Sequence, residues 1–107
     1  MAWRSKKEVY PVSKYVTLVR LSAQGMASMG DPKKAYDEMV EASARMGINV
    51  IGGYATLGPY DLMVLYDAPN ETAAAGMAMG LCARMNGQAE TWTLIPPEDF
   101  GKLPVKK

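Results

Sequence analysis

The sequence of 107 residues contains no histidine and a single cysteine, Cys82. Without histidine there is no Ser-His or Cys-His catalytic pair, no usual general base near neutral pH, and no imidazole ligand for a transition metal. One cysteine excludes an internal disulfide, and its place in an apolar helical pattern favours a buried thiol over a nucleophile. The nine methionines are interpreted as core residues, because a soft-metal site would need further ligands. We therefore expect no metal and no cofactor.

Excess charge and long apolar runs are also missing. The 12 basic and 11 acidic residues leave a formal net charge of +1, which provides no overall attraction to nucleic acid or to anionic membranes. No apolar run approaches the roughly 20 residues that span a bilayer. The N-terminus, with Arg4, Lys6 and Lys7, lacks the hydrophobic segment of a signal peptide. We expect a single cytoplasmic domain with neither a nucleic-acid nor a membrane partner.

Along the chain, segments with the residue pattern of strands alternate with segments that have the pattern of helices. Residues 15–21, 48–56, 60–66 and 90–95 are rich in β-branched, aromatic and other apolar residues and are predicted as strands. A helix is predicted to begin after Asp31, with Pro32 in its first turn, and to end at Gly47. A second helix is predicted between Asn70 and Gly87, whereas residues 24–30 are read as a connection. Paired glycines at positions 52 and 53 predict a bulge or a close backbone approach.

This element order predicts an α+β, ferredoxin-like βαββαβ fold. Short connections and right-handed crossovers favour a four-stranded antiparallel sheet in the order 4-1-3-2, with both helices on one face. The domain is expected over residues 14–96, with tails at 1–13 and 97–107. Because the strands are apolar at adjacent positions, the face without helices needs a cover, and we expect a second copy of the chain to provide it.

Several motifs carry a family resemblance. They are the opening strand at 15–21, Gln24-Gly25, the strand with Tyr54, the segment Gly58-Pro59-Tyr60-Asp61, and the closing Glu90-Thr91. With these motifs, residues 15–95 resemble the GYD domain family. The chain departs from the family signature because Pro59 separates Gly58 from Tyr60. The resemblance implies a dimeric α/β barrel of ferredoxin-like subunits, and it implies little about activity.

Polar residues are expected to meet at one end of this sheet. The predicted topology brings together Arg20, Asp61 and Glu90, with Gln24, Tyr54 and Tyr60 nearby. Arg20 and Asp61 form either a structural ion pair or a site in which Arg20 anchors an anionic ligand and Asp61 acts as acid or base. The strand aromatics either line a pocket or pack in the core. The candidate ligand-binding residues are Arg20, Gln24, Tyr54, Tyr60, Asp61, Glu90 and Trp92.

Three functions follow from these residues and resemblances. The leading hypothesis is a homo-oligomeric protein that binds a small organic ligand in a pocket near the strand ends. The second is a cofactor-independent enzyme of the isomerase, lyase or monooxygenase type, with Asp61 as the catalytic residue; it depends on analogy with other dimeric barrels. The third is a stand-alone sensing or assembly module, because the chain is similar to the ligand-sensing domain of the leucine-responsive regulators.

Overall fold

The computed structural model of the chain describes residues 13–104. The predicted N-terminal tail therefore lies outside the described residues, apart from Ser13. The elements in chain order are β1 (Ser13–Leu21), α1 (Ala23–Ser28), α2 (Pro32–Ala44), β2 (Asn49–Ala55), β3 (Leu62–Ala68), α3 (Glu71–Met85), β4 (Gly87–Leu94) and a 3₁₀ helix, η1 (Pro97–Lys102). No helix within residues 13–104 is long and apolar enough to cross a bilayer.

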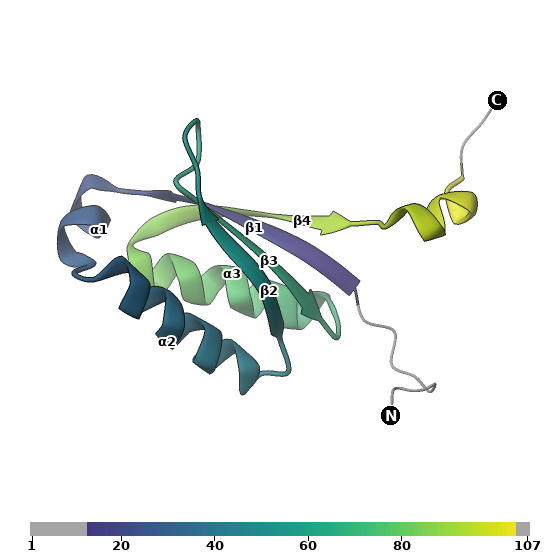
Figure 1. The fold of residues 1–107 in the computed structure, drawn as a ribbon, viewed down its shortest axis with the longest axis horizontal. Coiled ribbons are helices and arrows are strands. Elements are labelled where there is room, and N and C mark those ends of the chain that lie inside the picture. Colours follow the sequence, from purple (N-terminus) through teal and green to yellow (C-terminus); the bar gives the residue numbers. More distant parts are fainter. Residues whose placement is uncertain (1–12, 105–107) are drawn as a thin grey trace.

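The sheet is antiparallel and has the strand order β2-β3-β1-β4. Figure 1 shows α2 and α3 on the same side of the sheet. The predicted ferredoxin-like fold, its strand order and its one-sided helices are therefore confirmed. We call the side packed against these helices the helix face and the other side the open face.

The helix face holds the main core. Tyr15 and Val19 of β1 are buried with Val64 and Tyr66 of β3, and Leu81 of α3 packs in the same cluster. Burial of each such side chain contributes about 1.5–3 kcal/mol. Polar atoms in this core are paired: the Thr17 hydroxyl lies 2.7 Å from the Tyr66 hydroxyl and 2.9 Å from that of Thr91. The buried hydroxyls therefore satisfy one another across three strands.

Side-chain caps start both long helices where the sequence predicts them. Asp31 accepts a hydrogen bond from the Lys33 N–H at 3.0 Å, and Asn70 accepts one from the Ala73 N–H at 2.9 Å. Each bond satisfies an amide that has no partner within its own helix. Helix α2 ends at Ala44, before the predicted end at Gly47, and Met46 lies after its last turn and is 49% exposed.

The predicted connection at residues 24–30 is wrong in part, because it contains α1. Ser22 caps this short helix by accepting the Gly25 N–H at 2.9 Å. The same hydroxyl donates to the Asn86 carbonyl at 2.7 Å, so it also satisfies the end of α3. Gly25 is buried against this end. The helix is thus stabilised by a tertiary contact that sequence periodicity does not reveal.

The glycine pair of β2 accounts for two features. A register shift between Val50 and Gly52 forms a bulge, and Gly53 lies where a Cβ atom would overlap the Tyr36 ring. Both predicted uses of the pair are therefore present. All four strand starts differ from prediction by one to three residues: β1 begins at Ser13, β2 at Asn49, β3 at Leu62 and β4 at Gly87. Gly87 pairs with Leu21 and completes the β1–β4 ladder. The predicted polar tail after residue 96 includes η1.

Candidate functional site

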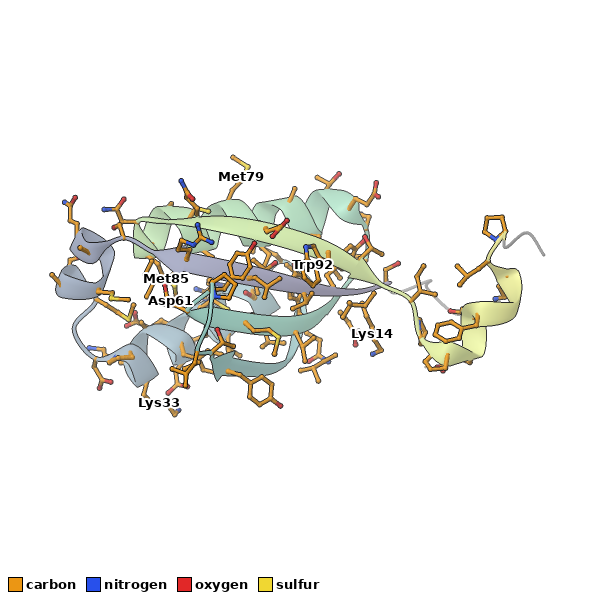
Figure 2. All side chains as sticks on the ribbon, turned by 90° about the horizontal axis from the view of Figure 1, so that it is seen from above. Lys14, Lys33, Asp61, Met79, Met85 and Trp92 are labelled. Atoms are coloured by element: carbon orange, nitrogen blue, oxygen red, sulfur yellow. The ribbon has the colours of Figure 1, made fainter. Side chains whose placement is uncertain are left out.

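An apolar pocket of about 410 Å³ lies on the helix face where β1 and β2 end and β3 begins. Its walls come from the strand ends, from α1, from the start of α2 and the connection between these helices, and from the last residue of α3. The lining residues are Leu21, Met26, Met29, Gly30, Pro32, Tyr36, Ala55, Asp61, Leu62 and Met85. Figure 2 shows Asp61 and Met85 at the same end of the sheet. A pocket of this volume accommodates a small organic molecule.

Asp61 supplies the carboxylate of this pocket. Its Oδ2 accepts the Leu21 N–H at 2.8 Å, and its own N–H donates to the Val19 carbonyl at 2.9 Å. The register of β1 and β3 pairs Val19 with Leu62, so a straight strand would place residue 61 beside Arg20 on the open face. The chain instead bends at Asp61. The carboxylate consequently reaches the Leu21 amide and the helix-face pocket.

Arg20 lies beside Tyr60, which the sequence analysis expected nearby. Its Nε donates to the Pro59 carbonyl at 2.8 Å, and its guanidinium lies over the Tyr60 ring, 5.3 Å from the centroid. Tyr60 in turn hydrogen-bonds to the Glu90 carboxylate. This bond is the main reason why the pKa of Tyr60 is raised, and burial and the negative charge of Glu90 act in the same direction. The predicted ion pair of Arg20 and Asp61 is absent from the ion pairs of residues 13–104.

The predicted polar corner is therefore divided between the two faces of the sheet. Arg20, Tyr60 and Glu90 meet in a second, shallow pocket of about 290 Å³, together with Gln88 and Ala89. Asp61 lines the larger pocket on the other side. The register places Tyr54 opposite Met63, and Trp92 opposite Val16, on the open face. Gln24 is an exposed residue of α1 that lines neither pocket.

The sequence interpretation missed most walls of the larger pocket. Met26 and Met29 belong to the segment that was read as a connection, and Tyr36 belongs to α2. Methionine and tyrosine at helical spacing are ordinary core residues, so their identity alone does not mark a site. The signal that was present is Gly53, because a glycine inside a strand marks the close approach of another group, here the Tyr36 ring.

The fold and the larger pocket together define the protein as a ferredoxin-like α+β domain with an apolar cavity at its strand ends. The GYD domain model matches residues 15–103. The chain belongs to the GYD domain family, and the predicted resemblance is confirmed.

Comparison with solved structures supports the fold. The crystal structure of MtbAldR superposes with a TM-score of 0.56 at 12% sequence identity, over 88% of this chain and 60% of that chain. The chain thus corresponds to little more than half of that protein, and the likeness concerns the fold alone. No curated protein matches the sequence.

The family signature has a structural role in this chain. Gly58 adopts φ 131°, a conformation that side chains other than hydrogen disfavour. The loop is closed by the Thr56 hydroxyl, which donates to the Tyr60 carbonyl at 2.5 Å. It places Tyr60 on the open-face side, against Arg20, and Asp61 in the helix-face pocket. The signature therefore sends neighbouring side chains to opposite sides of the sheet.

Proposed function

We propose that the protein binds a small organic ligand in the apolar pocket at the strand ends. The observation that carries this proposal is the pocket itself, which combines a volume of about 410 Å³ with mainly apolar walls and one carboxylate, that of Asp61. Ligand sites of globular proteins have this character: apolar walls provide affinity, and a few polar groups fix orientation. The position also agrees with the sequence-based hypothesis of a site near the strand ends.

Filling the pocket is expected to abolish binding without unfolding the protein. Ala55 lines the pocket and is exposed, so Ala55→Phe occupies ligand space at small cost to stability. We expect affinity for any pocket ligand to fall at least tenfold, which isothermal titration calorimetry can measure. Ala83→Phe is the matched control, because Ala83 is exposed on α3 and lies outside the pocket lining. Equal affinity of both variants would place the ligand elsewhere.

The enzyme and sensor hypotheses remain predictions from resemblance. Asp61 lines the pocket and is therefore placed to contact a ligand, but its hydrogen bond from the Leu21 amide also gives it a structural task. Cytoplasmic residence likewise remains a prediction. We place ligand binding first because it requires only the pocket. Catalysis also requires a particular reaction, and the residues that line the pocket do not identify one.

We further propose that a second copy of the chain covers the open face. Val16 and Leu18 of β1 alternate with the helix-face residues and therefore point to this face, where both are already buried within the single chain. Met63 and Leu65 of β3 point to the same face and are half-buried. Trp92 of β4 lies beside them and is 49% exposed; Figure 2 shows its place over the sheet. An apolar sheet face of this kind is typical of an interface between subunits.

The charges on the open face favour a copy of the same chain over a charged partner. At one end Lys14 pairs with Asp67 at 3.0 Å. At the other end Arg20 and Glu90 both contact Tyr60. Each end thus carries one positive and one negative side chain, so two identical faces related by a two-fold axis meet without net repulsion. This balance supports a homodimer.

Trp92→Glu is expected to weaken the dimer about 30-fold or more, because a buried aromatic residue at an interface contributes roughly 2 kcal/mol or more. Analytical ultracentrifugation over a range of concentrations measures the change. Met79→Glu is the control: Met79 is 73% exposed on α3, away from the open face. A monomeric unaltered protein, or equal dissociation of both variants, would contradict the proposed interface.

A further inference from the structure

The charge in the larger pocket has no balancing cation among the described residues. Asp61 is the only acidic or basic residue in the pocket lining. The basic side chains that form ion pairs within residues 13–104 do so with other acids: Lys14 with Asp67, Lys33 with Asp37, and Lys102 with Asp99. Arg20, the nearest basic residue in the β1–β3 register, contacts Pro59 and Tyr60 instead. The pocket therefore presents a carboxylate and no positive group.

Among residues 13–104, one amide hydrogen bond reaches the half-buried side-chain carboxylate of Asp61, which lies between apolar walls. A carboxylate has about four lone-pair sites, and the Leu21 N–H accounts for one at 2.8 Å. Removing a charged group from water is costly unless a partner of opposite charge or further hydrogen bonds replace the lost hydration. A ligand that enters this pocket displaces water from Asp61. The ligand gains most if its own head group is a cationic hydrogen-bond donor.

The remaining walls determine the rest of such a ligand. Met26 and Met29, in α1 and at its end, and Met85, at the end of α3, contribute thioether side chains, and Tyr36 contributes an aromatic ring. Methionine side chains are flexible and polarisable, and they pack well against aromatic rings. Walls of this kind suit a flat or flexible hydrocarbon group and offer no counterpart for an acidic head group.

We propose, on the basis of the ligand-binding function proposed above, that the pocket accepts a small apolar amine whose ammonium group hydrogen-bonds to Asp61. The hydrocarbon part lies among the methionines and Tyr36. A carboxylate or phosphate in the same position is repelled by Asp61. This reverses the expectation that Arg20 anchors an anionic ligand, since Arg20 lies on the opposite side of the sheet from the pocket.

The test uses three probes that share one ring system and differ in the head group: 1-naphthylmethylamine, 1-naphthalenemethanol and 1-naphthoate. Isothermal titration calorimetry with the full chain at pH 7 gives their dissociation constants. Since a hydrogen bond to a charged group contributes roughly 1.5–3 kcal/mol, we expect the amine to bind about tenfold or more tightly than the alcohol. The carboxylate is expected to bind most weakly.

The Asp61→Asn variant tests whether the preference for the amine depends on the carboxylate of Asp61. Asparagine keeps an oxygen that can accept the Leu21 N–H, and it removes the negative charge. We expect the alcohol to retain its affinity within about threefold while the preference for the amine disappears. Glu41→Gln is the matched control, because Glu41 is an exposed carboxylate of α2 outside the pocket lining, and it is expected to leave the preference unchanged.

The outcomes test the preference for an amine, which rests on the proposed ligand-binding function, separately from ligand binding itself. Equal binding of the three probes to the unaltered protein overturns the amine inference and leaves the pocket as a binding site. A preference that persists in Asp61→Asn overturns the role of Asp61. Failure of all three probes to bind contradicts both proposals. Because the order of the probes is measured on the unaltered chain, the inference stays testable even if Asp61→Asn does not fold.

Discussion

Replacing Gly25 with alanine is expected to destabilise the protein by about 3 kcal/mol, because a methyl group at this position would overlap the end of α3. A Cβ atom on Gly25 would fall inside contact distance of the Met85 carbonyl oxygen and 3.1 Å from that of Asn86. Both atoms belong to the backbone, so no side-chain rotation relieves the overlap. Chemical denaturation should show the loss directly, and thermal unfolding should shift downward by about 15 °C.

Helix propensity alone would predict the opposite result, because replacing a helical glycine with alanine normally stabilises a protein. Gly76 lies on α3, and a Cβ atom there would meet nothing within 4 Å. Gly76→Ala should therefore stabilise the protein by about 0.5–1 kcal/mol, as expected for an exposed helical glycine. If Gly25→Ala also stabilised the protein, then α1 would not pack against the end of α3 as described, and the wall of the pocket that α1 provides would be misplaced.

Truncating Tyr66 to alanine is expected to cost about 4 kcal/mol, since Tyr66 is fully buried in the core. Its ring stacks on Tyr15 with centroids 5.8 Å apart, and its hydroxyl is bonded to Thr17. The loss of the ring leaves a cavity between the sheet and the helices. Equilibrium denaturation in urea measures this cost. An effect below about 1 kcal/mol would contradict the packing of the helix face.

Tyr66→Phe separates the ring from the hydroxyl. It should cost only about 1 kcal/mol, because the Thr17 hydroxyl keeps Thr91 as its partner. Burial raises the pKa of Tyr66 above its ordinary value, although the hydrogen bond with Thr17 and the nearby Thr91 hydroxyl act in the opposite direction. Above about pH 10 the unfolded chain therefore loses this proton more readily than the folded protein, and stability falls as the pH rises. The phenylalanine variant should lack this component of alkaline destabilisation.

Much of the fold could be predicted because its signals are local. Asp31 and Asn70 mark helix starts through their own backbone hydrogen bonds. Runs rich in β-branched, aromatic and other apolar residues predict the strands, and the crossover rules then leave one natural strand order, which the structure confirms. Helix α1 was missed for the opposite reason. Its cap residue, Ser22, also bonds to Asn86, a contact between residues distant in the chain.

The candidate site was harder to predict because it depends on where side chains point. The sequence correctly placed Arg20, Asp61 and Glu90 near one end of the sheet, as the strand register confirms for the adjoining residues. It did not determine that Tyr60 would contact Arg20 while Asp61 reaches the Leu21 amide. The bend of the chain at Asp61, just before β3, decides which of these side chains lie on each face of the sheet.

The sequence by itself determined the order of the four strands and the two long helices and the arrangement of the strands, because caps, periodicity and turn residues act within a few positions of the chain. Its motifs also identified the family. The tertiary structure decided which residues share a pocket. Met26, Tyr36, Asp61 and Met85 come from four separate segments, and only the packing of α1 and α2 against the strand ends brings them together. The sequence predicted a site near the strand ends that includes Asp61. Since no local rule links such segments, the apolar walls of the pocket became evident only in three dimensions.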